Sequence, residues 1–82
     1  MALRESLTRF IAERIIQDRN AKVDPEESLL DRGLIDSVAL LNLITFLESE
    51  MGVRIPDDEM FPENFDSVVA MERLVAKLRG PA

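Results

Sequence analysis

The chain has 82 residues, 46% of them hydrophobic and 32% charged, and its formal net charge is -6. It contains no histidine and no cysteine, which excludes a Ser-His-Asp triad, a thiol nucleophile, a disulfide framework and metal sites built from His or Cys. The excess of acidic residues argues against nucleic acid or an anionic membrane as the main partner, because both require clustered Lys and Arg. We expect one small domain over residues 1–82, with its packed core within about 3–79.

Signals for export or membrane insertion are missing from the sequence. No apolar run approaches the roughly 18 residues that a membrane span needs. The first residues turn polar at once and lack the apolar region of a signal peptide. We therefore expect a cytoplasmic protein that is not held in a membrane.

An amphipathic helix is predicted over about residues 3–19. Its apolar residues recur at steps of three and four and share one face; they are Leu3, Leu7, Phe10, Ile11 and Ile15. The helix should end near Asn20, and residues 20–35 then form a long connection. Gly33 offers a position with positive φ in this loop. Apolar residues are expected to pin the loop onto the core, namely Val23, Leu29, Leu30, Leu34 and Ile35.

A second helix is predicted from about Ser37 to about Met51. Either Asp36 or Ser37 can cap its N-terminus, and Gly52 suits the position just after its end. At 100° per residue the core residues fall on one broad face; they are Ala39, Leu40, Leu43, Ile44 and Leu47. Leu41 lies at the border of this face and should be only partly covered.

The C-terminal third of the chain is predicted to hold one short and one longer helix. Residues 54–60 form an extended entry with Pro56 leading into a short helical turn, and residues 61–64 form a second connection. The last helix should start near Asp66 or Ser67 and run to about Arg79, with Phe65 as a hydrophobic staple. The fold class is therefore all-α, a small four-helix bundle of three longer helices and one short helix, with the second and last helices at its centre.

Ser37 is the candidate functional residue, and two readings of it remain open. A serine at the start of a helix is ordinarily a cap. Alternatively its hydroxyl is exposed at the tip of the domain, where a modifying enzyme can reach it. The helix N-terminus behind it would favour a phosphate through its free N–H groups and positive dipole end. Such a serine suits covalent phosphodiester attachment.

The stretch from Leu29 to Val38, Leu-Leu-Asp-Arg-Gly-Leu-Ile-Asp-Ser-Val, resembles the attachment motif of acyl and peptidyl carrier proteins. The resemblance continues through Leu41 to Glu48, through Met51-Gly52-Val53-Arg54-Ile55-Pro56-Asp57 and to Ser67-Val68, and covers about residues 3–79. The Gly-Leu-Ile-Asp-Ser form and the Pro62-Glu63-Asn64-Phe65 stretch are similar to discrete, free-standing carriers of specialised metabolism. Val38 stands where leucine or methionine is more usual in the family.

The resemblance implies a non-catalytic protein with an acyl-carrier-like fold. Its 4′-phosphopantetheine arm would be attached to Ser37, with Asp36 orienting the loop and the phosphate region of the arm. The arm would hold acyl or aminoacyl intermediates as thioesters in polyketide, nonribosomal peptide or related biosynthesis. The implied partners are a phosphopantetheinyl transferase, an adenylating enzyme or acyltransferase that loads the arm, and downstream synthase or tailoring enzymes.

The same resemblance places the partner surface on the second helix and the loop before it. Val38, Leu41 and Thr45 are the expected exposed or half-exposed patch beside Ser37. Acidic residues that would meet basic groups on partners are Asp36, Glu48, Asp57, Asp58 and Glu59. These acids equally suit a solvated acidic face without a partner.

Two other functions are open to the sequence alone. One is a small helical protein-interaction module without a covalent prosthetic group, since grooves between helices receive amphipathic peptides. The other is an enzyme that uses paired carboxylates, such as a glycosidase, for which Asp57 and Asp58 are available. A domain of this size offers little room for a cleft, which disfavours the second. No long apolar stripe is left over, so we expect a monomer.

Overall fold

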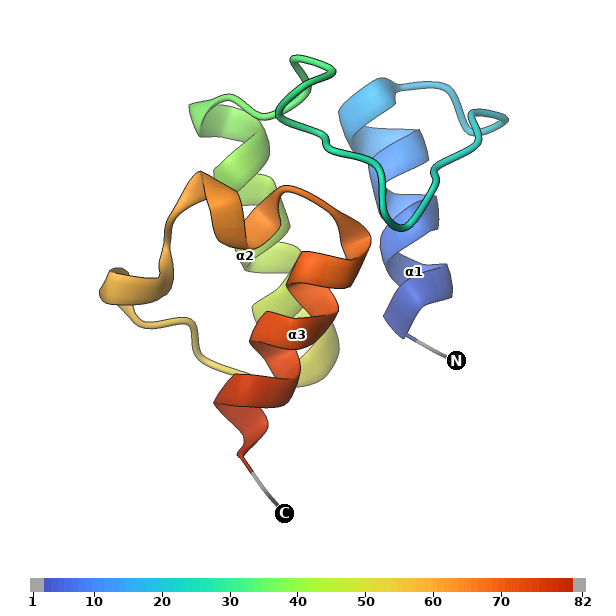
Figure 1. Cartoon of the computed structure of the whole chain (residues 1–82). Helices are drawn as coiled ribbons and strands as arrows, with labels where there is room; N and C mark the ends of the chain where they lie inside the picture. Colours follow the sequence, from blue (N-terminus) through green and yellow to red (C-terminus); the bar gives the residue numbers. More distant parts are fainter. Residues whose placement is uncertain (1–2, 81–82) are drawn as a thin grey trace.

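The structure is a computed structural model that describes residues 3–80, and over this range it contains helices and loops but no strands. Three α-helices form the body: α1 (Leu3–Phe10), α2 (Ser37–Met51) and α3 (Val68–Arg79). Helix α1 runs upwards in Figure 1, whereas α2 and α3 both run downwards. The all-α prediction is confirmed. The fourth, short helix is a 3₁₀ turn rather than an α-helix.

The first helix changes its winding and ends earlier than predicted. After Phe10 the chain continues as a π-helix, η1 (Ile11–Ile16). The N–H of Gln17 donates to the carbonyl of Ala12, and the N–H of Asp18 donates to the same carbonyl at 2.8 Å. Gln17 then adopts a left-handed conformation with φ 64°. The predicted helical stretch to Arg19 is therefore wrong for its last three residues.

Helix α2 has the bounds that the sequence predicted. Asp36 is its N-cap, with an extended backbone, and the side chain accepts a hydrogen bond from the N–H of Ala39. Gly52 ends the helix at φ 64°, a left-handed conformation that costs glycine little. Its N–H donates to the carbonyl of Glu48 at 3.0 Å.

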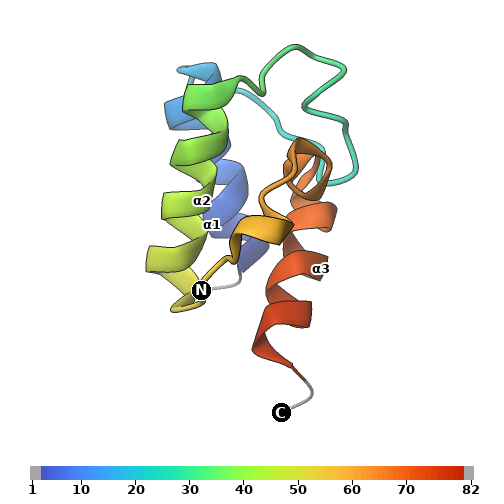
Figure 2. The same ribbon diagram turned by 90° about the vertical axis from the view of Figure 1, so that its left-hand side faces the viewer.

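The link from α2 to α3 contains two 3₁₀ turns, η2 (Asp57–Glu59) and η3 (Pro62–Phe65). Figure 2 shows it leaving the lower end of α2 and rising to the upper end of α3. The sequence predicted a connection in place of η3. Phe65, expected as a staple, is fully buried and is a core residue.

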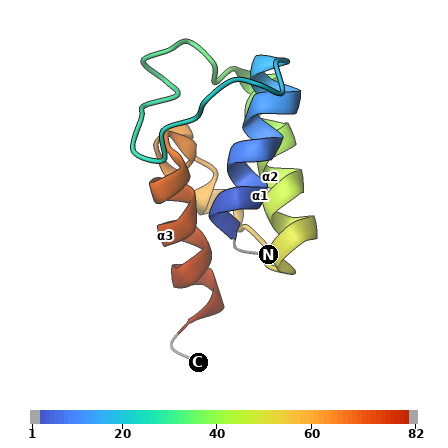
Figure 3. The ribbon, with the colours of Figure 1, turned by 90° about the vertical axis from the view of Figure 1, so that its right-hand side faces the viewer.

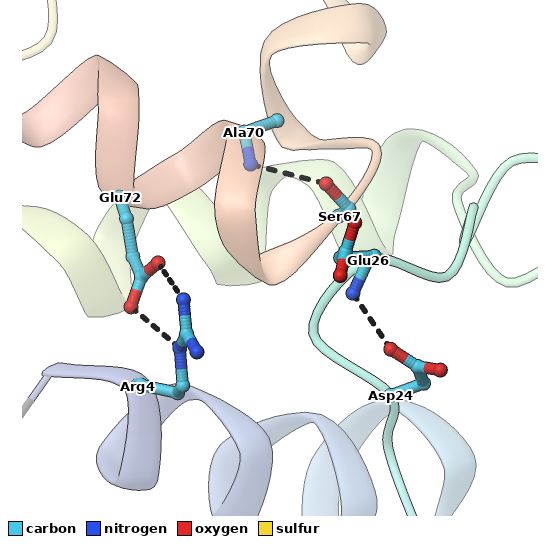
Figure 4. Close-up of polar contacts among 6 residues, drawn as sticks. All are labelled: Arg4, Asp24, Glu26, Ser67, Ala70 and Glu72. Atoms are coloured by element: carbon cyan, nitrogen blue, oxygen red, sulfur yellow. Dashed lines mark hydrogen bonds and ion pairs between the residues drawn. The ribbon is translucent and has the colours of Figure 1, made fainter.

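Helix α3 begins as predicted, with Ser67 as its N-cap accepting from the N–H of Ala70 at 3.0 Å. Figure 4 shows this cap and, beside it, the two hydrogen bonds from the Arg4 guanidinium to the Glu72 carboxylate. The distances are 3.0 and 2.8 Å, and the pair joins α1 to α3. The hydrogen bond to Glu72 raises the pKa of Arg4 above its ordinary value.

The core draws on all three α-helices and on the segments between them, rather than on two central helices. Each of the three α-helices contributes fully buried side chains, among them Leu7 from α1, Leu43 and Leu47 from α2, and Met71 from α3. The loop and the link add Leu29, Ile55 and Phe65. Leu30, predicted to pin the loop, is instead 37% exposed because its neighbour Leu29 fills the core position.

None of the helices within residues 3–80 is long and apolar enough to cross a membrane.

Candidate functional site

The start of α2 is organised so that Asp36, not Ser37, caps the helix. The Asp36 carboxylate accepts the N–H of Ala39 at 2.7 Å. Ser37 is the first helical residue and is exposed. Its hydroxyl makes no hydrogen bond to any residue within 3–80. The structure thus rules out the reading of Ser37 as a cap and leaves its hydroxyl available for chemistry.

The loop that leads to Ser37 is held down by Asp66, at the end of η3. The carboxylate of Asp66 accepts from the Ser28 hydroxyl at 2.7 Å and from the N–H of Leu30 at 3.0 Å. The carbonyl of Asp66 accepts the N–H of Leu29 at 2.6 Å. The N–H of Val69 donates to the carbonyl of Pro25 at 3.0 Å. These contacts fix the loop over the start of α3, as Figure 3 shows, before it returns to α2.

The chemistry of this helix start fits a phosphodiester on Ser37. Beyond the Asp36 cap the first turn of α2 contains no acidic residue, so no second carboxylate competes with a phosphate for the N–H groups that Asp36 leaves free. The one nearby carboxylate, Asp36, is already engaged with Ala39. Within residues 3–80 no basic side chain forms a hydrogen bond with the Ser37 hydroxyl.

The predicted partner residues on α2 lie at the surface close to Ser37. Val38 and Leu41 are 66% and 62% exposed, and Thr45 is exposed. Sequence reasoning missed Phe61, a large apolar side chain that is 54% exposed between η2 and η3. Its backbone is extended, with ψ 141°, as expected for a residue before proline. The proline after Phe61 makes the extended backbone predictable from the sequence, but it does not indicate that the Phe61 side chain is exposed.

The predicted acidic residues fall into two groups. Asp57 and Asp58 are exposed in η2. The Glu48 carboxylate instead accepts the N–H of Ile55 at 3.0 Å, which fixes the chain after Gly52. Glu59 pairs with Lys77 of α3 and accepts from the Asn64 side chain. The hydrogen bond from Lys77 holds the pKa of Glu59 below its ordinary value and raises that of Lys77.

No cluster of three or more His, Cys, Asp or Glu side chains within residues 3–80 is placed to hold a metal ion. The paired carboxylates of Asp57 and Asp58 stand exposed on a single 3₁₀ turn. Carboxylates tuned for acid-base catalysis are typically shielded from water. This arrangement gives no support to a carboxylate-based enzyme.

Comparison with known proteins gives one family model and several similar proteins. Residues 7–75 match a family model described as a phosphopantetheine attachment site. The chain is 42% identical over 62 residues to "Aminoacyl carrier protein 1" of Bradyrhizobium diazoefficiens, covering 76% of this chain and 68% of the relative.

Two further relatives match over a longer range. The chain is 31% identical over 77 residues to "Probable acyl carrier protein PigG" of a Serratia species, covering 94% and 88% of the two chains. It is 28% identical over 79 residues to "D-alanyl carrier protein" of Bacillus pumilus, covering 96% and 100%. The similarity therefore extends over nearly the whole chain and includes the loop and helix start around Ser37.

Proposed function

Because this chain belongs to the phosphopantetheine-binding family of carrier proteins, we propose that Ser37 is the residue that bears the 4′-phosphopantetheine arm. The observation that carries this assignment is that two neighbouring residues at the start of α2 have different roles. Asp36 caps the helix through Ala39, whereas the Ser37 hydroxyl is exposed and unengaged. The arm supplies the thiol that the chain lacks, and its cargo is held there as a thioester.

The attachment chemistry needs only this hydroxyl from the chain. The oxygen of Ser37 would form the new bond to the pantetheine-side phosphorus of coenzyme A. The pyrophosphate bond would break, the adenosine bisphosphate would leave with the bonding electrons, and the serine proton would pass to a base on the transferase. Asp36 would orient the loop and the phosphate region. This role fits a protein that lacks His and Cys.

We propose an aminoacyl cargo, on the support of the relative named "Aminoacyl carrier protein 1" at 42% identity. Carrier proteins deliver their cargo to partner enzymes in biosynthesis. Here those would be a phosphopantetheinyl transferase, an adenylating enzyme that loads the arm, and a downstream enzyme that takes the aminoacyl group. The chain itself would have no catalytic role. We further propose that the protein is monomeric and cytoplasmic.

The proposed contact surface comprises Val38, Leu41 and Thr45, with Asp57 and Asp58 as steering charges. We add Phe61 to it, because an exposed phenylalanine is among the residue types enriched at interfaces. Glu48 is a weaker candidate than the sequence indicated, since its carboxylate is engaged by Ile55.

Intact mass spectrometry of the protein, made with and without a phosphopantetheinyl transferase, tests the assignment. We expect one phosphopantetheine per chain and one thiol that reacts with iodoacetamide, since the polypeptide has no cysteine. Ser37→Ala should block both, whereas Ser67→Ala, which changes the capping serine of α3, should block neither. A mass gain that persists in Ser37→Ala would refute the assignment.

A further inference from the structure

A continuous groove runs between the first helix and α2. One depression of about 520 Å³ lies between Phe10, Arg14 and Gln17 on one side and Asn42, Thr45 and Ser49 on the other. We call these six residues the α1–α2 groove. A second depression, of about 210 Å³, shares Arg14, Gln17 and Asn42 with it and extends to Asp36 and Val38, the residues that flank Ser37. The groove therefore opens at the attachment site.

The two walls of the groove are in direct contact at its floor. The rings of Phe10 and Phe46 stack with their centroids 4.3 Å apart and an interplanar angle of 27°. Above this apolar floor the lining is polar, and Glu13 adds one acidic side chain on the wall opposite Asn42 and Thr45. The side chains of Arg14, Gln17, Asn42, Thr45 and Ser49 form no hydrogen bond or ion pair with any part of the chain that the structure describes. Their donors and acceptors are open to a ligand.

The wall from the first helix carries two backbone irregularities. Arg14 belongs to the π-helical segment η1. Such turns are rare in proteins, and those that occur are frequently found at functional sites. Gln17 holds φ 64°, which non-glycine residues seldom adopt. Because Gln17 is the C-cap of η1, this left-handed conformation ends the first helix at the edge of the groove.

We propose that the α1–α2 groove receives the phosphopantetheine arm folded back from Ser37. This inference rests on the proposed function, because it takes Ser37 as the attachment residue. The lengths agree: α2 rises about 18 Å between residues 37 and 49, and the main chain of the arm equals about five extended residues, or about 17 Å. An arm that follows the groove thus brings its thiol to the level of Ser49.

The chemistry of the groove matches the arm along its length. The phosphodiester carries a negative charge, and Arg14 is the cation that lines the depression beside Asp36. The two amides of the arm both donate and accept hydrogen bonds, as do the side chains of Gln17 and Asn42. The hydroxyls of Thr45 and Ser49 offer the same capacity further along, and the methyl groups of the arm would pack on the Phe10–Phe46 pair.

Paramagnetic relaxation in NMR tests this placement directly. A nitroxide maleimide on the holo protein labels only the thiol of the arm, because the polypeptide has no cysteine. We expect the backbone amides of Glu13, Phe46 and Ser49 to lose several-fold more intensity than those of Asp58 and Phe61 in the link. Strongest broadening in the link, or no broadening beyond the first turn of α2, would overturn the groove proposal.

Two variants sharpen the experiment. Asn42→Phe fills the groove where its two depressions meet and should abolish the selective broadening, whereas Ala76→Phe, at an exposed site on α3, should leave it unchanged. If Asn42→Phe does not fold, Arg14→Gln serves instead and should weaken the broadening. Persistence of the pattern in the groove variant refutes the proposal. Mass spectrometry first establishes the arm on Ser37, so a missing arm counts against the proposed function and a misplaced one only against the groove.

Discussion

The carboxylate of Asp36 accepts the backbone N–H of Ala39 at 2.7 Å and thereby relieves the adjacent serine of the capping role. At the start of α3 the arrangement is reversed, because Ser67 itself caps and its hydroxyl accepts the N–H of Ala70. The two serines have similar sequence surroundings, Asp-Ser-Val in both cases. Only the Ser37 hydroxyl is not used in capping a helix.

The first prediction compares these serines in stability. Ser67→Ala should lower the free energy of unfolding by about 1 kcal/mol, because it removes an N-cap. Ser37→Ala should change it by at most about 0.5 kcal/mol, since an exposed side chain without a partner is removed. Urea denaturation of the unmodified proteins measures both. Equal losses in the two variants would contradict the assignment of the caps.

The second prediction separates the two roles of Asp36. Asp36→Ala should cost about 1 kcal/mol of stability through loss of the cap, whereas Asp36→Asn should retain most of it, because asparagine caps equally well. If the charge of Asp36 orients the phosphate region, Asp36→Asn should still slow the transferase reaction. The time course of the mass gain, alongside urea denaturation, measures this. A normal rate in Asp36→Asn would limit Asp36 to capping.

The third prediction concerns the carboxylate that holds the loop. Asp66→Ala removes acceptors from Ser28 and Leu30 and should lower the free energy of unfolding by about 2 kcal/mol, because hydrogen bonds to a charged acceptor are among the stronger ones. Hydrogen exchange at the N–H of Leu30 should accelerate. Asp24→Ala is the control: among the described residues the Asp24 side chain accepts only the N–H of Glu26 (Figure 4), and its loss should cost at most about 0.5 kcal/mol. Similar losses in the two variants would argue against a pinned loop.

The fourth prediction is a pH dependence from Glu59 and Lys77. The pKa of Glu59 is lowered in the folded protein from its ordinary 4.5, so the pair stabilises the fold above that pH and loses its contribution as the pH falls through the lowered pKa. The stability difference between the wild type and Lys77→Gln should therefore be largest near neutral pH and shrink below pH 4.5. Thermal unfolding between pH 7 and about pH 3 measures it. A constant difference would show that the ion pair is not its cause.

The fifth prediction concerns the exposed apolar side chains. Leu41→Ser and Phe61→Ser should leave the free energy of unfolding nearly unchanged, because Leu41 is already 62% exposed and Phe61 is 54% exposed. Both should slow transfer of the proposed aminoacyl cargo onto the arm, if these residues form the contact surface. Phe65→Ala, by contrast, empties the core and should cost about 3–5 kcal/mol. Unchanged loading of both surface variants would move the contact surface elsewhere.

The fold could be predicted from local pattern to a large extent. The apolar periodicity and the cap and stop residues around α2 predicted both of its ends, because helix termini depend on short-range hydrogen bonds. The end of the first helix was predicted three residues too late, since the shift to π-helical bonding at Ala12 leaves no signature in periodicity. The apolar periodicity likewise gave no sign of the 3₁₀ turn η3 or of the outward position of Leu30.

The sequence by itself determined that this is a small helical protein without histidine or cysteine, with a serine at the start of its second helix, in a carrier-like pattern. It left open whether Asp36 or Ser37 caps that helix, because both residue types cap well. Only the tertiary structure decided this, through the extended backbone of Asp36. It also brought Asp66 under the loop and Arg14 beside Asp36. These residues are far apart in the chain, and their proximity depends on how the helices pack rather than on any local pattern.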